Sequence, residues 1–222
     1  MKPWYFLILL LYMLTACRKD RTKPVTGNDC RSSCYILAGT IIDTPGKFGL
    51  AGVELELRST YSGYTFHNPL NILAKTVTDN NGKYRFSVPS GSVDLNRNYL
   101  SVVLKKTTYF YRTPDEKLGL YDTKFKPDSA ITVNAAMFRQ ATMDIKLEIS
   151  RPFAPNTFSF YYDYGSKTAH GYNVNPEDAG KLYNVTTAGD MKTIIFWDID
   201  KVRYKDSLTV PAGQKGTYTI KF

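Results

Sequence analysis

Apolar and polar residues alternate with a period of two over several short stretches of this chain. In residues 53–58 the odd positions are apolar (Val53, Leu55, Leu57) and the even positions are charged, which is typical of a strand with one face in water. Residues 84–88 repeat the alternation. Further β-rich runs lie at residues 35–42, 76–78, 100–104, 130–133 and 143–149. No window of about twelve residues has a convincing helical period, so we predict an all-β protein.

Turn signals separate these runs at nearly regular spacing. Asp79-Asn80-Asn81-Gly82 is a strong turn sequence because Asn and Gly tolerate a positive φ, and Pro89 ends the strand that follows. Many short strands joined by such turns favour a β-sandwich. We predict that it spans residues 35–149, because Arg151-Pro152 and Pro155 would interrupt a β ladder just beyond it.

Residues 150–222 are predicted to form a second, smaller β-rich region. Residues 157–164 read as a strand with aromatic residues on both faces, and residues 193–199 are the most apolar strand of this region. Residues 201–210 and 216–222 supply a closing pair. A region of about 70 residues has a small core, so it should either pack onto the first module or form a compact second sandwich.

Three segments of the predicted first sandwich together form one pattern. In it a turn leads into a core strand, and a later hairpin fills the interior with its aromatic residues. They are residues 38–43 (AGTIID), 49–55 (GLAGVEL) and 76–89 (TVTDNNGKYRFSVP). This pattern resembles the carboxypeptidase regulatory-like module, a transthyretin-like or Ig-like β-sandwich. The resemblance covers residues 36–149, is strongest over 36–89, and is interrupted by an insertion at 61–72. It implies an accessory module without catalytic residues of its own.

The N-terminal residues have the pattern of an export signal. Lys2 precedes an apolar run at residues 4–14, about half of the ~20 residues needed to span a bilayer as a helix. The following Leu14-Thr15-Ala16-Cys17 resembles the lipobox of bacterial lipoproteins. The resemblance implies that a signal peptide of residues 1–16 is removed and that Cys17 is lipidated, which anchors the chain to a membrane. The alternative is a plain signal peptide with an incidental cysteine.

Residues 17–34 are predicted to form a tether between this lipid and the folded part. Acidic runs in this position mark surface export in Bacteroidetes-like lipoproteins, and only Asp20 is present, so an outer-membrane location is expected with its periplasmic or cell-surface side left open. Cys30 and Cys34 are spaced so that an extended chain would hold their Cα atoms about 13 Å apart, so a bond between them requires a turn. In an oxidising envelope a disulfide is expected, with free thiols as the alternative.

Composition and charge exclude several classes of protein. At 43% hydrophobic and 22% charged residues the chain is globular, and its two His and three Cys leave little material for a zinc enzyme. The formal net charge is +9, of which +1 belongs to the signal peptide and a net +3 to the linker through Cys34. The remaining basic residues are scattered, so no nucleic-acid partner is predicted.

The C-terminal third carries a set of aromatic and acidic residues with the chemistry of a glycan site. The candidate ligand-binding residues are Tyr161, Tyr162, Asp163, Tyr164, Tyr172, Trp197 and Asp198. Flat rings stack on sugar faces, and carboxylates accept paired hydrogen bonds from hydroxyl groups. The alternative, which a strand-rich region favours, is that the rings fill a β core. Asp198 and Asp200 alone do not establish a Ca²⁺ site, and no metal or cofactor is predicted.

The sequence has no recognisable catalytic motif. It lacks G-x-S-x-G, H-E-x-x-H, a P-loop and G-x-G-x-x-G. The prediction is therefore a non-catalytic, membrane-anchored envelope lipoprotein that acts as a binding or assembly module for a glycan or another envelope protein. The alternative is an envelope hydrolase that uses His170 and Asp163 in the aromatic third.

Overall fold

The computed structural model describes residues 25–26, 30–61, 71–112, 117–120, 124–150, 152–155, 157–165 and 170–221. The predicted signal peptide, Cys17 and most of the insertion at 61–72 lie outside these residues. The described part is all β apart from two short 3-10 turns, η1 (Ser90–Ser92) and η2 (Pro176–Asp178), which confirms the predicted fold class. Within it, no helix has the length and apolar character to cross a membrane.

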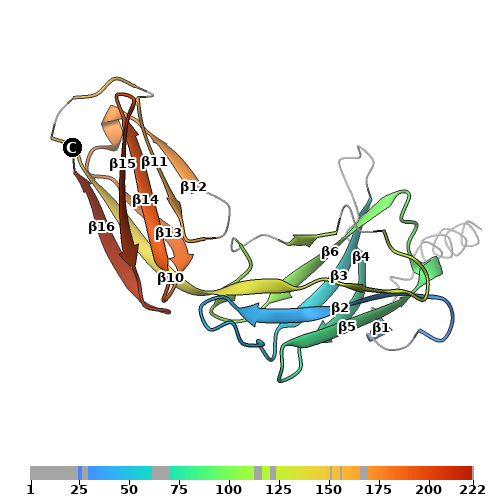
Figure 1. Cartoon of the computed structure of the whole chain (residues 1–222). Helices are drawn as coiled ribbons and strands as arrows, with labels where there is room; N and C mark the ends of the chain where they lie inside the picture. Colours follow the sequence, from blue (N-terminus) through green and yellow to red (C-terminus); the bar gives the residue numbers. More distant parts are fainter. Residues whose placement is uncertain are drawn as a thin grey trace, which may run out of the picture.

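The strands form two lobes that are joined by one long strand, β10 (Ala135–Glu148) (Figure 1). In the first lobe, a five-stranded sheet in the order β1-β4-β3-β6-β8 packs against a second layer in which β2 lies between β5 on one side and β9 and β10 on the other. The strands of this lobe are β1 (Val25–Thr26), β2 (Cys34–Asp43), β3 (Glu54–Tyr61), β4 (Asn71–Val77), β5 (Lys83–Pro89), β6 (Asn98–Lys105), β7 (Tyr109–Phe110), β8 (Leu118–Gly119) and β9 (Ala130–Thr132).

The period-two alternation read from the sequence builds the core of the first lobe. Leu55 and Leu57 of β3 come from one layer, and Tyr84 and Phe86 of β5 come from the other. All four side chains are buried in the core between the layers. The opposite face of β3 is less exposed to solvent than predicted, because Glu56 is only 7% exposed. Basic side chains from three strands cover its carboxylate.

The turn predicted at residues 79–82 joins β4 to β5. The Asp79 Oδ1 atom accepts hydrogen bonds from the backbone N–H groups of Asn81 at 2.9 Å and Lys83 at 2.8 Å. Gly82 has a φ of +73°, and a Cβ at this position would lie 2.3 Å from the Ile41 carbonyl oxygen. Glycine is therefore required both by the backbone conformation and by the close approach of β2.

The second lobe is also a sandwich. A four-stranded sheet in the order β12-β11-β14-β15 packs on β13, β16 and the C-terminal part of β10. Its strands are β11 (Phe158–Asp163), β12 (His170–Val174), β13 (Leu182–Ala188), β14 (Lys192–Ile199), β15 (Val202–Thr209) and β16 (Lys215–Lys221). Phe158, Phe160 and Ile195 of the first sheet meet Met143 and Ile145 of β10 in its core.

Strand β10 belongs to both lobes. Residues Ala135–Met137 pair in parallel with β2, the next two residues pair with β7, and residues from Gln140 onward pair with β13 and β16. A single seven-stranded sheet therefore runs through the whole molecule. The domain division between residues 149 and 150 stays a prediction, and the structure adds that the strand before it contributes to both cores.

Aromatic rings fill the junction between the lobes. Phe138 of β10 contacts Phe110 of β7, with ring centroids 5.6 Å apart, and Tyr164 after β11, at 5.4 Å, and these two rings also contact each other. The Tyr164 hydroxyl donates a hydrogen bond to the carbonyl of Arg112. The second lobe is thus attached to the first by packed side chains as well as by β10.

Candidate functional site

The predicted ligand-binding residues lie on both faces of the four-stranded sheet of the second lobe. Because side chains alternate along a strand, Tyr161, Asp163 and Asp198 point to the outer face of this sheet, away from the core. Tyr162 and Trp197 point the other way. The structure therefore does not bring the candidate residues together in one site.

The outer face carries two stacked aromatic rings. Tyr161 of β11 and Phe196 of β14 are cross-strand neighbours, and their ring centroids are 5.1 Å apart at an interplanar angle of 18°. On the other side of Tyr161, its neighbour in β12 is Gly171. A Cβ at Gly171 would meet only ordinary contacts, at 3.7 Å from Tyr161 Cβ and 3.8 Å from the Phe160 carbonyl oxygen. Tyr161 therefore has no cross-strand side chain on its β12 side.

Charged residues of β15 border this aromatic pair. The Arg203 guanidinium lies 5.4 Å from the centroid of the Tyr161 ring, and the Lys205 ammonium lies 5.5 Å from that of Phe196. Asp198 accepts two hydrogen bonds from Arg203, at 2.8 Å from Nε and 3.1 Å from Nη2. Hydrogen bonding to Asp198 raises the pKa of Arg203 further above its ordinary value. We call Tyr161, Phe196, Asp198, Arg203 and Lys205 the outer platform.

The remaining tyrosines of the predicted site belong to the core. Tyr162 and Tyr164 are buried, and Tyr172 stacks on Phe160 with ring centroids 5.0 Å apart. Burial raises the pKa of the Tyr162 hydroxyl above its ordinary range. These rings stabilise the second lobe and do not present a face to a ligand.

Trp197 lies at the open edge of the second sandwich. It stacks on Tyr204 of β15, with ring centroids 5.6 Å apart, and Tyr204 is 42% exposed. Next to them the Tyr218 hydroxyl donates a 2.7 Å hydrogen bond to Asp206. This group faces the core side of the sheet, so it is separate from the outer platform.

The two residues of the alternative hydrolase site lie on opposite faces of the same sheet. His170 is paired with Tyr162 on the core side, where its ring stacks on those of Tyr162 and Tyr164. Its Nε2 atom is 3.3 Å from the Tyr164 hydroxyl. Asp163 faces outward and accepts a 2.7 Å hydrogen bond from the backbone N–H of Gly165. The geometry gives no support to an acid–base pair of His170 and Asp163.

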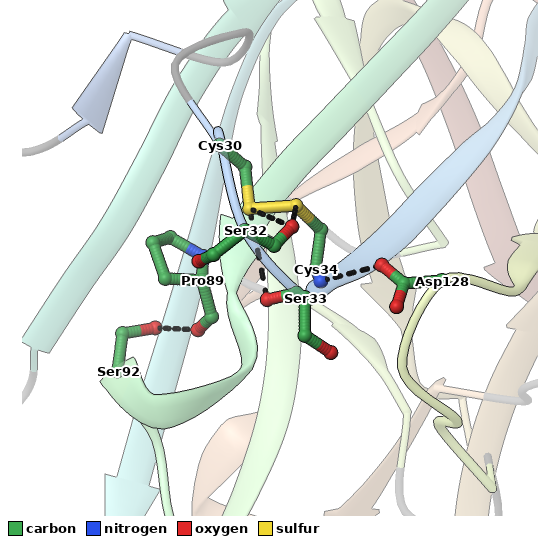
Figure 2. The surroundings of a disulfide bond; sticks show 7 residues. All are labelled: Cys30, Ser32, Ser33, Cys34, Pro89, Ser92 and Asp128. Atoms are coloured by element: carbon green, nitrogen blue, oxygen red, sulfur yellow. Dashed lines mark hydrogen bonds between the residues drawn. A yellow bond between two sulfur atoms is a disulfide. The ribbon is translucent and has the colours of Figure 1, made fainter.

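A disulfide joins Cys30 and Cys34 where the tether enters β2, and the two Cα atoms are 6.1 Å apart. Figure 2 shows it beside the turn that holds Pro89 and next to Asp128. Asp128 binds the first residue of β2 twice: its side chain accepts from Cys34 N at 2.9 Å, and its backbone N–H donates to Cys34 O at 2.7 Å. The start of β2 is thereby fixed to the chain that leads into β9.

No metal cluster marks another site in the part of the chain that the structure describes. No group of three or more His, Cys, Asp or Glu side chains is placed to share a metal there. Two shallow surface hollows, of about 460 and 540 Å³, lie beside Lys106 and beside Glu148. Neither contains a predicted ligand-binding residue.

Three members of the outer platform were missed by sequence reasoning: Phe196, Arg203 and Lys205. The spacing of these residues in the sequence could have predicted that they lie together. Strands β14 and β15 form a hairpin in which Phe196 is opposite Lys205 and Asp198 is opposite Arg203. Recognising it requires the register of the hairpin, which is set by the turn at Asp200.

Comparison with known proteins leaves the family open. No known protein family matches the sequence, and no curated protein matches it either. The TIE protein of Bacillus anthracis is 14% identical with a TM-score of 0.35 over 85% of this chain, which spans only 34% of that protein. The shaft pilin SpaA of Lactobacillus rhamnosus GG, as a D295N mutant, is 10% identical with a TM-score of 0.33, over 83% of this chain and 96% of the pilin. The minor pilin GBS52 of Streptococcus agalactiae is 10% identical with a TM-score of 0.31, over 84% and 94%.

At these identities and TM-scores the similarities establish neither a family nor a function. The resemblance to carboxypeptidase regulatory-like modules stays a prediction, and the sandwich architecture rests on the sheet topology itself.

Proposed function

We propose that this protein is a non-catalytic, lipid-anchored binding module of a bacterial envelope and that the outer platform of its second lobe binds a glycan. The observation that carries the proposal is the stacked pair Tyr161 and Phe196 on the solvent side of a sheet. The two rings stabilise each other across the strands, and together they form an apolar surface on the solvent side of the sheet that a ligand can cover.

The chemistry of the platform suits a sugar ring. Gly171 leaves space beside the Tyr161 ring, where the apolar face of a pyranose could stack. Asp198 and Arg203 are already paired, so together they offer oxygen acceptors and N–H donors to hydroxyl groups without an uncompensated charge. A site that combines a stacking face with fixed hydrogen-bonding groups gains affinity because few side chains must be ordered on binding.

The position of the platform suits display from a membrane. In the proposal Cys17 carries the lipid, and the tether between Cys17 and Val25 can reach at most about 28 Å. Because β1 pairs with β4 at the edge of the first lobe, that lobe would lie next to the membrane. The second lobe lies at the other end of β10 (Figure 1), so the platform would be held away from the lipid surface.

Two experiments test the two parts of the proposal. For anchoring, globomycin should cause a lipidated precursor to accumulate in cells, whereas Cys17→Ser should abolish lipid labelling. An unlipidated wild-type protein would contradict the anchor. For binding, the full chain purified in detergent is applied to a glycan array. We expect a class of glycans whose signal is lost in Gly171→Val, because the added side chain fills the space beside Tyr161.

The matched control is Gly91→Val, since Gly91 lies in η1 of the first lobe and no atom lies within 4 Å of its Cβ position. Both variants should keep the thermal unfolding midpoint of the wild type. A glycan signal that survives Gly171→Val would contradict the platform as the site.

A further inference from the structure

We propose that β10 carries tension through this molecule, with its partner strands at both ends loaded in shear. The proposal rests on the proposed function, since tension arises only if the N-terminal side is held at a membrane while the second lobe holds a ligand. The force would first load the two-residue pairing of β1 with β4, reach β2 at the disulfide, pass along β2 to β10, and leave through the second lobe.

The direction of the strands in the first lobe sets up shear. Strand β2 begins at the end of the lobe away from the second lobe, and β10 leaves at the opposite end (Figure 1). The two strands are parallel, with Ile41 opposite Ala135 and Asp43 opposite Met137. Pulling β2 back by its first residue and β10 forward by its last therefore slides the strands along each other. All the bonds between them are strained together rather than one after another.

The same edge of β2 is bonded along most of its length. Strand β9 pairs in parallel with its first half, and the chain from residue 128 onward follows it. The connection between β9 and β10 is also bound: Val133 N–H donates to Ala38 O at 2.8 Å, and the Asn134 side chain accepts from Thr40 N at 2.9 Å.

A glycine makes this continuity possible. A Cβ on Gly39 would lie only 1.9 Å from the Val133 carbonyl oxygen, so only glycine lets the connection lie against β2. The same carbonyl accepts a 2.8 Å hydrogen bond from the Tyr84 hydroxyl of β5. The strand that receives the force is thus bound from both sides, because β5 pairs with β2 along its other edge.

At the C-terminal end of β2, side chains add further bonds between β2 and β10. Arg139 binds Asp43 at 3.1 Å through both Nε and Nη2, and Thr44 binds the Met137 carbonyl at 3.0 Å through both its backbone N–H and its hydroxyl. The two ends of β2 are therefore secured as well as its middle, at the disulfide and Asp128 on one side and at this cluster on the other.

The second lobe holds β10 in the same way. There β10 is a central strand, antiparallel to β13 and parallel to β16, with Thr142–Glu148 opposite Lys215–Lys221. Extracting β10 by its N-terminal end slides it against both neighbours at once. The edge hairpin β14–β15 is different, because pulling its open ends at Lys192 and Thr209 would separate one pair at a time.

Single-molecule force measurements on the chain from residue 17 onward test the proposal. Handles at the two ends of the chain load β2 and β10 in shear, and handles at positions 192 and 209 unzip the hairpin in the same protein. We expect the end-to-end unfolding force to be clearly higher than the hairpin force at equal pulling rate, because bonds loaded in shear must break together. Asn134→Ala should lower the end-to-end force and leave the hairpin force unchanged. The matched control Asn98→Ala loses an exposed hydrogen bond to the Asp94 carbonyl at the start of β6, in the other sheet, and should lower neither.

Equal forces in the two directions would overturn the proposal, as would an end-to-end force that does not respond to Asn134→Ala. The measurement contains no glycan and no membrane. A failure to find a glycan ligand would therefore contradict the proposed function and leave the mechanical result unaffected.

Discussion

Asp43 and Asp190 lie in different lobes and bind the same guanidinium group. Arg139 of β10 donates to Asp43 at 3.1 Å and to Asp190 at 3.0 Å, and Asp43 is fully buried. The hydrogen bonds that Arg139 donates to Asp43 raise the pKa of Arg139 further above its ordinary value, so the guanidinium group stays protonated. Together with the aromatic contacts around Phe138, this bridge makes the two lobes one unit.

Removing the bridge should uncouple the lobes. In Arg139→Met the aliphatic stem is kept, but Asp43 loses its charged partner in a buried position, which is costly for the first lobe. We expect differential scanning calorimetry to show two thermal transitions where the wild type shows one, with the first-lobe transition at the lower temperature.

The comparison variant is Asp190→Asn, which breaks the second-lobe arm of the bridge and leaves the pair of Asp43 and Arg139 intact. It should also separate the two transitions, but the midpoint of the first lobe should fall much less than in Arg139→Met because Asp43 keeps its partner. A single, unshifted transition in Arg139→Met would contradict the coupling.

Gly39→Ala should strongly destabilise the first lobe. The added Cβ would lie 1.9 Å from the Val133 carbonyl oxygen and 3.0 Å from the Tyr84 ring, so the backbone between β9 and β10 must move. Overpacking of this kind costs about 1–3 kcal/mol of unfolding free energy. Urea denaturation measures it, with Gly91→Ala as the control. Equal stability of the two variants would refute the close approach of Val133.

Much of the fold could be predicted because its alternation is local. Val53, Leu55 and Leu57 are buried as their spacing indicated, and so are Tyr84 and Phe86 on the facing sheet. The role of β10 could not be predicted, because alternation has the same period in both lobes and does not say which sheet a strand joins. That choice depends on long-range pairing, such as that of Met137 with Asp43.

The candidate site was harder to predict for a related reason. Composition placed tyrosines and carboxylates in the C-terminal third, but the pleat sends Tyr161 outward and Tyr162 inward from adjacent positions. A prediction by residue type groups them, and the structure separates them. Gly171, whose missing side chain leaves the space beside Tyr161, has no chemical signature in the sequence.

Glu56 should make the first lobe sensitive to acid. Burial alone would raise its pKa, but hydrogen bonds from Arg58, Lys75 and Lys105 outweigh this and lower the pKa from 4.5 to about 2. Because the folded state binds the proton more weakly than the unfolded state, the stabilisation is present above pH 4.5 and is lost as the pH falls towards 2. We expect a loss of about 2 kcal/mol over this range, allowing for the exposure of the lysines.

Urea unfolding at a series of pH values measures this loss. In Glu56→Gln the contribution is missing, so the variant should be less stable than the wild type at pH 7 and the difference should shrink on acidification. A difference that stays constant from pH 7 to pH 2 would contradict the assignment.

The disulfide should stabilise the start of β2. Closing a loop of this size removes about 2 kcal/mol of unfolded-state entropy in the chain-entropy description. Cys30→Ser, which leaves the buried Cys34 in place, should therefore lower the unfolding free energy by about that amount. Reduction of the wild type should produce the same shift, and reduction of Cys30→Ser should produce none. If reduction leaves the wild type unchanged, the bond does not contribute.

The central claim is that the outer platform of the second lobe binds a glycan, and a comparison of two tyrosines tests it most directly. Tyr161 and Tyr204 lie on opposite faces of the same sheet. Titration of the full chain with a glycan identified on the array gives the affinity of each variant. Tyr161→Ala should weaken binding about tenfold, and Tyr204→Ala should leave it unchanged, with the unfolding midpoints confirming that both are folded. Unchanged affinity in Tyr161→Ala, or a loss confined to Tyr204→Ala, would contradict the claim.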